Sequence, residues 1–378
     1  MSLSSHERER YQRHLALAEI GTTGQEKLKA ARVLVVGAGG LGSPAALYLA
    51  AAGCGTLGLL DGDRVELSNL QRQVLFDTSG IARAKAEAGR ERLASLNPEV
   101  RIVAHALELK AANVRALFAE YDLVIDGTDR LATRYLVNDA CVILRRPLVS
   151  AAIYRFEGQL MTYVPGAGPC YRCVFPQAAD GMVASCAEAG VLGVLPGVLG
   201  TLQATEALKL ITGVGEPLTG RLLTYDALEM RFTEFRVSRR ADCAVCGDAP
   251  TITEPRDPPP PPRAAAPPGV RHLSATALRE LLGAAPPKAP VLVDVREVHE
   301  FSAGHLAGSI NIPLSELPQR LGEIATDCAP VFICRSGGRS LAACRMALGA
   351  QIAAPGNLEG GLLAWAAEVD PTLCVRAP

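Results

Sequence analysis

The stretch Arg32-Val-Leu-Val-Val-Gly-Ala-Gly-Gly-Leu-Gly42 decides the fold of the first part of the chain. Its apolar half, residues 32–36, predicts a buried strand, and the GxGxxG pattern of residues 37–42 predicts a tight turn that opens a helix. Glycines let the backbone approach an anionic group, and the amides of a helix amino terminus favour negative charge. We therefore expect a nucleotide site that includes Gly37, Gly39, Gly40 and Gly42.

Apolar segments of strand length alternate with alanine- and leucine-rich segments around this stretch. A helix is expected over residues 43–52, and strands over residues 56–60 and 122–125. This order predicts an α/β fold with a doubly wound, Rossmann-like parallel sheet. Asp61 ends the second strand about twenty residues after the glycines, where a carboxylate is suited to bind ribose hydroxyls.

A proline-rich segment divides the chain into two parts. Residues 253–269 include five consecutive prolines, which favour an extended linker between domains of residues 1–252 and 270–378. After the linker, residues 291–294 and 331–334 predict short buried strands, and a helix is expected from about residue 340 to 348. The second part is therefore expected to be a smaller α/β domain.

The composition of the 378 residues limits the partners that we expect. The chain has 38 basic and 39 acidic residues, so no overall basic charge favours nucleic acid or an anionic membrane. Its first residues are polar, without a signal peptide, and no apolar run has membrane-spanning length, so a cytoplasmic location is expected. Eleven cysteines in such a chain indicate metal binding or thiol chemistry rather than disulfides.

A group of polar and charged residues favours ATP over a dinucleotide as the ligand. Arg72 and Lys85 carry charges suited to a triphosphate, and Asp129 follows a strand and is suited to hold Mg²⁺. Arg72 and Asp129 are the expected catalytic residues of this site. The predicted nucleotide contacts outside the glycine loop are Asp61, Ser68, Asn69, Leu70, Gln71, Arg72, Lys85 and Asp129.

The cysteines fall into three settings. Cys170-x-x-Cys173 and Cys243-x-x-Cys246 form two chelating pairs, and four thiolates suit a structural, tetrahedral Zn²⁺. Cys186 lies in a small-residue segment expected to be a loop. Cys334 begins the stretch Cys334-Arg-Ser-Gly-Gly-Arg339 between a strand and a helix, where backbone amides, the helix amino terminus, Arg335 and Arg339 are expected to stabilise a thiolate.

The first part resembles the MoeB/ThiF family of adenylyltransferases, which are similar to ubiquitin-activating enzymes. The resemblance covers residues 10 to 250 and rests on the glycine loop, Arg10-Tyr-Gln-Arg-His14, Leu60-Asp-Gly-Asp63, Ser68-Asn-Leu-Gln-Arg-Gln73, Phe156-Glu-Gly-Gln159, the two cysteine pairs and Cys186-Ala-Glu-Ala-Gly-Val191. It implies adenylation of the carboxy-terminal glycine of a small ubiquitin-like (β-grasp) sulfur carrier.

The same resemblance implies a homodimer in which Arg13 reaches the ATP of the neighbouring subunit. It also implies a direct role for the Cys186 thiol on a loop near the adenylate. The chain departs from many relatives at Arg130, which follows Asp129 where asparagine is usual, so no nucleotide role is assigned to Arg130.

The second part resembles the rhodanese family from residue 270 to the carboxy terminus. The motifs are Asp294-Val-Arg-Glu297, Gly304-His-Leu-Ala-Gly-Ser-Ile-Asn-Ile-Pro313, the Cys334 loop and Gly360-Gly-Leu-Leu-Ala-Trp365. The resemblance implies that Cys334 carries a persulfide, while His305 and Trp365 are expected to be structural. Together, the two halves resemble adenylyltransferase/sulfurtransferases of the molybdopterin-synthase type.

The expected reaction joins the two chemistries in one chain. An acyl-adenylate has a good leaving group and a persulfide is a strong nucleophile, so the product is a carrier thiocarboxylate. The resemblance implies a carrier that ends in Gly-Gly and a sulfur donor such as a cysteine desulfurase or thiosulfate, while the pathway that the carrier serves, molybdopterin, thiamine, cysteine or tRNA thiolation, stays open. Three alternatives stay open: a ubiquitin-type activating enzyme that passes a thioester, an NAD- or FAD-dependent oxidoreductase fused to rhodanese, and a non-enzymatic zinc scaffold.

Overall fold

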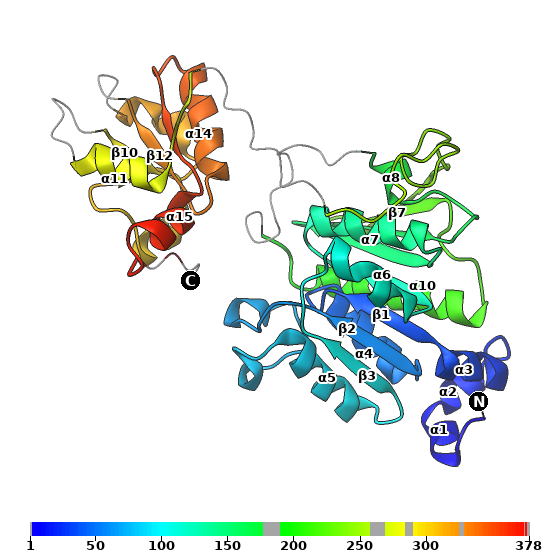
Figure 1. Cartoon of the computed structure of the whole chain (residues 1–378). Coiled ribbons are helices and arrows are strands. Elements are labelled where there is room, and N and C mark those ends of the chain that lie inside the picture. Colours follow the sequence, from blue (N-terminus) through cyan, green and yellow to red (C-terminus); the bar gives the residue numbers. More distant parts are fainter. Residues whose placement is uncertain are drawn as a thin grey trace. The chain divides into compact units, whose positions relative to one another are not determined.

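The computed structural model describes residues 2–176, 190–257, 269–283, 290–324, 329–373 and 375. The chain divides into two compact units, residues 1–262 and 263–378 (Figure 1). The expected linker, residues 253–269, spans this division, although residues 258–268 lie outside the described part, and the exact domain limits stay a prediction. Each unit is described by itself below.

An eight-stranded sheet forms the centre of the first unit, in the order β3-β2-β1-β4-β5-β6-β7-β8. Its strands are β1 (Arg32–Val36), β2 (Thr56–Leu60), β3 (Arg101–His105), β4 (Leu123–Asp126), β5 (Leu148–Tyr154), β6 (Glu157–Tyr163), β7 (Arg221–Asp226) and β8 (Arg231–Arg236). The first five are parallel, as expected, but β6, β7 and β8 are antiparallel additions. Only Arg155 and Phe156 separate β5 from β6, and a connection this short permits only antiparallel pairing.

Helices cover both faces of this sheet, which confirms the doubly wound architecture. One layer consists of α4 (Gly42–Ala51), α5 (Lys85–Leu96) and α10 (Leu195–Thr212), and the other of α6 (Ala111–Ala119) and α7 (Leu131–Ile143). Alternate residues of β1 serve the two layers: Val33 and Val35 belong to the core beneath α4, and Leu34 and Val36 to the core beneath α7. Shorter elements are α1 (Ser5–Arg10), α2 (Gln12–Leu15), α3 (Gly21–Ala30), η1 (Leu67–Asn69), η2 (Thr78–Gly80) and α8 (Tyr171–Val174).

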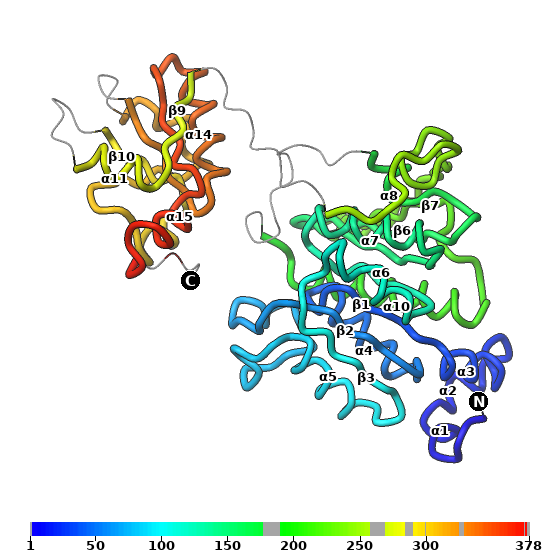
Figure 2. Tube along the Cα trace, in the orientation of Figure 1, coloured from blue at the N-terminus to red at the C-terminus, as the bar shows by residue number. Residues whose placement is uncertain are grey.

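The strand order reverses beside β1, which lies between β2 and β4 although β4 follows β1 by almost ninety residues. Figure 2 shows β1, β2 and β3 in this order on one side of that point. Open α/β sheets bind ligands at such a switch point, beyond the carboxyl ends of the strands. The loops that follow β1 and β4 meet there, since a Cβ atom on Gly37 would lie 3.0 Å from the Gly127 carbonyl oxygen. The fold therefore places the glycine loop and the Asp129 loop together.

The second unit contains a five-stranded parallel sheet in the order β11-β10-β12-β13-β9. Its elements are β9 (Arg271–Leu273), α11 (Ala275–Gly283), β10 (Leu292–Asp294), α12 (Val298–Ala303), β11 (Ile310–Asn311), α13 (Leu317–Arg320), η3 (Leu321–Glu323), β12 (Val331–Ile333), α14 (Gly338–Gly349), β13 (Gly356–Leu358) and α15 (Gly361–Glu368). Phe332 packs into the core beneath α14, and Ile333 into the opposite core beside α15. Both predicted strands and the predicted helix are confirmed within three residues at each end.

Among the described residues, no helix is both long and apolar enough to cross a membrane.

Candidate functional site

The glycine loop connects β1 to α4 by backbone contacts that only glycine permits. Gly37 has φ +88°, and its amide donates to the Leu60 carbonyl oxygen over 2.8 Å. A Cβ atom on Gly42 would lie 1.8 Å from the Gly37 carbonyl oxygen, so the loop folds tightly onto the start of α4. Leu41 precedes α4 and has no polar side chain to cap it, while the Ser43 amide donates to the Gly39 carbonyl oxygen over 2.9 Å and Pro44 has no amide hydrogen. The backbone of the glycine loop before α4, rather than the first turn of the helix, therefore lies toward a ligand.

Asp61 links the end of β2 to the glycine loop. Its Oδ2 atom accepts a hydrogen bond from the Ala38 amide over 2.9 Å, and its Oδ1 atom accepts one from the Asp63 amide over 2.8 Å. Burial is the main cause that raises the pKa of the Asp61 carboxyl. Each oxygen keeps a second lone pair, so the carboxylate is able to accept from ribose hydroxyls as well.

A second loop follows β4 and depends on the buried carboxylate of Asp126. Asp126 Oδ1 accepts hydrogen bonds from the Thr128 amide (3.0 Å) and hydroxyl (2.7 Å), and Oδ2 accepts from the Ser150 hydroxyl (2.9 Å). Arg134 donates through Nη2 to the Thr128 carbonyl oxygen over 2.8 Å. These contacts hold the loop from both sides and leave Asp129 exposed at its tip.

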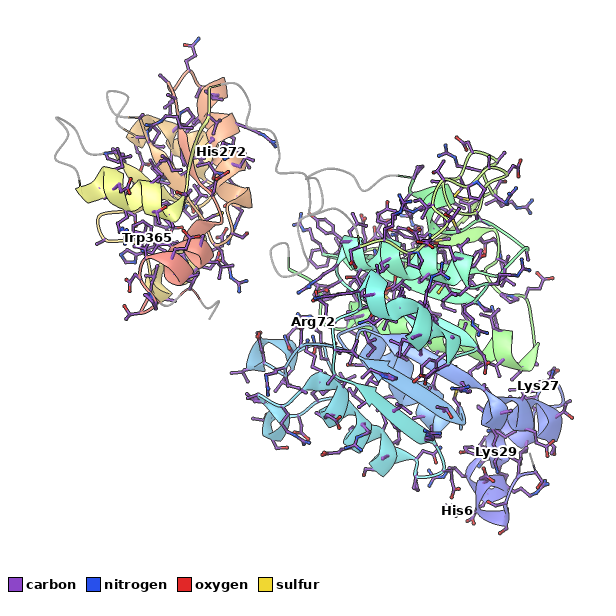
Figure 3. All side chains as sticks on the ribbon, viewed as in Figure 1. His6, Lys27, Lys29, Arg72, His272 and Trp365 are labelled. Carbon is purple, nitrogen blue, oxygen red and sulfur yellow. The ribbon has the colours of Figure 1, made fainter. Side chains whose placement is uncertain are left out.

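The segment between β2 and α5 supplies cations. Arg72 donates through Nη1 to the Ser68 carbonyl oxygen over 3.0 Å, and Figure 3 shows it at the edge of the first unit. Lys85 begins α5 with a buried side chain, and its Nζ lies 3.3 Å from Asp63 Oδ2. Asn69, by contrast, has a local role, because its side-chain oxygen accepts from the Glu66 amide over 3.2 Å.

These residues surround a cavity of about 1440 Å³ at the switch point. Seven of the predicted nucleotide residues line it: Gly37, Gly39, Gly40, Asp61, Arg72, Lys85 and Asp129. The other predicted residues of the same chain are not part of the lining: Gly42, Ser68, Asn69, Leu70 and Gln71. The cavity therefore unites the glycine loop before α4, two cations and two carboxylates, a set that suits a polyphosphate with a divalent cation.

Arg13 is exposed on α2 and is not part of the cavity lining. Helix α2 lies on the side of the first unit opposite Arg72 (Figures 1 and 3). The expected role of Arg13 toward the ATP of a neighbouring subunit stays a prediction.

The cavity includes residues that the sequence analysis did not assign. Gln73 is buried beside the glycine loop with no hydrogen-bond partner for Oε1 in the described part of the chain. Arg134 and Tyr171 form another wall, with the guanidinium carbon 5.8 Å from the centre of the tyrosine ring. Gln73 belongs to the Ser68–Gln73 motif, and Tyr171 lies between two expected zinc ligands. Both residues could therefore have been predicted as part of the site, because they lie inside motifs that the sequence shows.

The four paired cysteines converge beside that wall. Their Sγ atoms all lie within 4.8 Å of one another, with 3.6 Å between Cys170 and Cys243 and 3.3 Å between Cys173 and Cys246. Tetrahedral Zn–S bonds of about 2.3 Å would separate the sulfurs by about 3.8 Å, so the donor set fits Zn²⁺. The Arg240 amide also donates to Cys173 Sγ over 3.4 Å, a contact typical of metal-bound thiolates.

Cys334 has the predicted position between β12 and α14, with a buried thiol. The Gly337 amide donates to Cys334 Sγ over 3.1 Å, and the Ser340 hydroxyl lies 3.3 Å from the same sulfur. Gly337 has φ +93°, a conformation that lets its amide point inward. The amides of Leu362 and Leu363 donate to the carbonyl oxygens of Cys334 and Arg335, which ties the loop to α15.

Arg335 and Arg339, the two arginines of the Cys334 loop, differ in their partners. Arg339 forms a bidentate ion pair with Glu300 of α12, at 2.6 and 2.8 Å. The Nε atom of Arg335 is buried and has no hydrogen-bond partner among the described residues. The prediction that both arginines add positive charge to the loop is therefore modified, because a carboxylate accompanies Arg339.

The remaining predictions for single residues have mixed outcomes. Cys186 lies outside the described residues, so its expected role stays a prediction. Trp365 is buried in the core of the second unit (Figure 3), and His305 stacks on Phe301 with ring centres 3.8 Å apart. Arg130 is exposed and pairs with Glu108 at 3.5 Å.

Comparison with known proteins identifies relatives over nearly the whole chain. The chain is 41% identical to an adenylyltransferase and sulfurtransferase MOCS3 of Aedes aegypti, covering 98% of this chain and 89% of that protein. It is also 41% identical to a probable adenylyltransferase/sulfurtransferase MoeZ of Mycobacterium tuberculosis, covering 98% and 96%. A sulfur carrier protein adenylyltransferase of Thermus thermophilus is 51% identical over 67% of this chain and 96% of its own length.

Solved structures extend the comparison to the fold of the first unit. A crystal structure of Escherichia coli MccB with ATP superimposes with a TM-score of 0.58 at 26% identity, covering 65% of this chain and 75% of that chain. The ThiF family pattern matches residues 11–245, and the rhodanese-like domain pattern matches residues 274–368. The cavity, the Cys334 loop and the relatives that match nearly the whole chain all point to the same two families. The chain belongs to the ThiF family and carries a carboxy-terminal rhodanese-like domain.

Proposed function

We propose that the chain adenylates the carboxy-terminal glycine of a small ubiquitin-like sulfur carrier and then replaces the adenylate with sulfur carried by Cys334. The relatives are named as adenylyltransferases and sulfurtransferases, and both family patterns are those of enzymes. The observation that carries the proposal is a cavity bearing Arg72, Lys85 and Asp129 in one unit, with an amide-held thiol in the other.

In the first unit, different residues of the cavity bind different parts of ATP. Asp61 accepts from the ribose hydroxyls, and the glycine loop before α4 faces the phosphates. Arg72 and Lys85 offset the charge of the triphosphate, and Asp129 holds Mg²⁺. This arrangement favours attack of the carrier carboxylate on the α-phosphate, with pyrophosphate as the leaving group.

The four cysteines Cys170, Cys173, Cys243 and Cys246 hold a structural Zn²⁺ in this proposal. Four thiolates fill the tetrahedral coordination and leave no open position for catalysis. The metal would stabilise the segment from Cys170 to Cys173, which includes Tyr171 at the wall of the cavity.

In the second unit, Cys334 receives sulfur and delivers it. A donor transfers its outer sulfur to the Cys334 thiolate, which becomes a persulfide. The persulfide sulfur attacks the acyl-adenylate carbonyl, AMP leaves, and an acyl disulfide forms. A second thiol, which we assign to Cys186, attacks the Cys334 sulfur and releases the thiocarboxylate, and an external thiol then reduces the resulting protein disulfide.

The partners follow from this chemistry. The carrier is a β-grasp protein ending in Gly-Gly, of the kind used in molybdenum cofactor biosynthesis, and the sulfur donor is a cysteine desulfurase or thiosulfate. We also propose a cytoplasmic homodimer in which Arg13 serves the cavity of the partner subunit.

The test is to supply the purified chain with ATP, Mg²⁺, a persulfide donor and candidate carriers ending in Gly-Gly. We expect carrier-dependent ATP–pyrophosphate exchange and a mass increase of about 16 Da on the carrier, the difference between oxygen and sulfur. A thioester between the carrier and Cys186 as the final product would favour a ubiquitin-type activating enzyme instead. Bound flavin or nicotinamide absorbance, without exchange, would favour an oxidoreductase.

A further inference from the structure

The charge around the Cys334 loop bears on which sulfur donor the second unit accepts. The loop carries two guanidinium groups, Arg335 and Arg339, but the Glu300 carboxylate of α12 meets Arg339 in a bidentate pair. The pair is mostly enclosed, with 21% of the Arg339 side chain and 12% of the Glu300 side chain exposed. Among the described residues, Arg335, Arg339 and Glu300 together carry a charge of +1, whereas the two arginines without Glu300 would carry +2.

The Glu300 carboxylate is held in place independently of Arg339. It accepts a hydrogen bond from the Glu297 amide over 3.1 Å, as part of the capping box that begins α12. Interaction with Arg339 and this backbone bond oppose desolvation by burial and lower the pKa of Glu300, so the carboxylate is charged at neutral pH. The negative charge is thus a fixed feature of the loop.

A net charge of +1 matches one thiolate or one persulfide anion. Thiosulfate would bring two further negative charges to a loop that already holds the Cys334 thiolate. A cysteine persulfide that reacts in its protonated form, R–S–SH, adds no negative charge to the loop. In surroundings with the dielectric constant of water, one unit charge about 6 Å away changes the attraction for a dianion by about tenfold.

We propose that Glu300 is a specificity-determining residue: by pairing with Arg339 it selects a cysteine-borne persulfide over thiosulfate as the sulfur donor of Cys334. The proposal rests on the proposed role of Cys334. In the favoured reaction, the Cys334 thiolate attacks the outer sulfur of R–S–SH, an S–S bond forms to Cys334, and the original S–S bond breaks. Its electron pair leaves on R–S⁻, and the proton stays on the transferred sulfur.

The test compares sulfur donors of different charge on the full chain. Thiosulfate and methanethiosulfonate both carry a sulfane sulfur, but their charges are −2 and −1, and the persulfide of N-acetylcysteine methyl ester has an uncharged carrier group. We expect Glu300→Gln to raise kcat/KM for thiosulfate about tenfold, to raise it less for methanethiosulfonate, and to leave persulfide transfer within about twofold of wild type. The gain should shrink as salt is added.

A second substitution separates charge from shape. Arg339→Gln added to Glu300→Gln should remove the gain with thiosulfate, since the source of that gain is the guanidinium charge that Glu300 no longer offsets. If Glu300→Gln transferred sulfur from the persulfide normally without a gain for thiosulfate, the proposal would be wrong. If Glu300→Gln did not fold, the single substitution Arg339→Gln would test the proposal. We expect it to lower kcat/KM for thiosulfate, because the negative charge of Glu300 is then not offset by Arg339. An unchanged kcat/KM for thiosulfate would overturn the proposal. Loss of transfer from every donor in wild type would instead contradict the role of Cys334.

Discussion

Arg134 lies with its Nε atom 3.3 Å from Asp126 Oδ2, forming a buried ion pair beneath the loop that carries Asp129. Asp126 is fully buried and Arg134 is 7% exposed, so removing either charge would leave the other unpaired in the interior. The pair also orients Thr128, which bonds to Asp126 through its amide and hydroxyl and to Arg134 through its carbonyl oxygen. The position of Asp129 thus depends on two residues that need not touch the nucleotide.

This relationship predicts that Asp126→Asn weakens Mg²⁺ use. We expect carrier-dependent pyrophosphate exchange to fall about tenfold and the half-saturating Mg²⁺ concentration to rise, because the loop holding Asp129 loses its charged support. Ser150→Ala removes one hydrogen bond from an uncharged donor to the same carboxylate, leaves the ion pair with Arg134 in place and should have a much smaller effect. Normal Mg²⁺ dependence in a folded Asp126→Asn protein would exclude this positioning role.

Arg72→Ala and Asp129→Ala should each abolish exchange, with a loss of at least about a hundredfold. Each substitution removes charge aimed at the triphosphate or its Mg²⁺. Arg83→Ala is the matched control, since Arg83 is an exposed cation paired with Glu91 and is not part of the cavity lining. Wild-type exchange in Arg72→Ala or Asp129→Ala would contradict the assigned site.

The cysteine cluster predicts one zinc ion per chain. Cys173→Ser or Cys246→Ser should lose the metal and unfold the first unit, because affinity at a structural zinc site is folding free energy. Cys54→Ala, which alters a buried thiol outside the cluster, should keep the metal. The measurements are metal analysis and circular dichroism, and wild-type protein without zinc would refute the prediction.

Cys334→Ala should separate the two chemistries. Adenylation is expected to stay near wild type, while sulfur transfer and thiocarboxylate formation are lost together, and added sulfide should restore the product. Cys344→Ala is the control within the same core, since burial raises the pKa of the Cys344 thiol to about 12 and leaves it protonated at neutral pH. Normal thiolation by Cys334→Ala from a persulfide donor would show that the second unit is dispensable.

The Glu300–Arg339 pair also predicts how the second unit responds to acid. The folded state lowers the pKa of Glu300, so the pair stabilises the unit fully above the unfolded pKa of about 4.3 and is lost as pH falls through the lower folded value. Trp365 is the single tryptophan of the chain and lies in the core of this unit, so its fluorescence reports this unfolding alone. Glu300→Gln should make the stability of the second unit fall less steeply below pH 4.5. A fall identical to that of wild type would mean that other carboxylates determine the acid sensitivity of this unit.

The sequence predicted the parts of the fold that depend on local pattern. Strands β1 and β2 have the predicted bounds, because runs such as residues 32–36 are buried on both faces and flanked by glycine or aspartate. The antiparallel strands β6 to β8 were not predicted: every side chain of β8 is exposed, so it lacks a hydrophobic run.

Where chemistry requires a particular residue type, the predicted residues lie together in the structure, as at Gly37, Arg72 and the four paired cysteines, and their roles stay predictions. The site was not predictable where a side chain has more than one available partner. Asn69 belongs to the quoted motif, yet its side chain accepts from the Glu66 amide in its own turn and is not part of the cavity lining. Glu300 reaches Arg339 from 39 residues away, and spacing in the sequence gives no sign of that tertiary contact.

The adjacency of β1 and β4 has a consequence for how the protein is made. Gly37 and Gly127 come together only after the ninety intervening residues have emerged and folded, since that contact closes a long loop. During synthesis, the glycine turn exists well before its opposite wall, and Tyr171 and Phe235 arrive later still. A nascent chain therefore has no complete nucleotide pocket until its amino-terminal unit is essentially finished, and it cannot consume ATP while half-built.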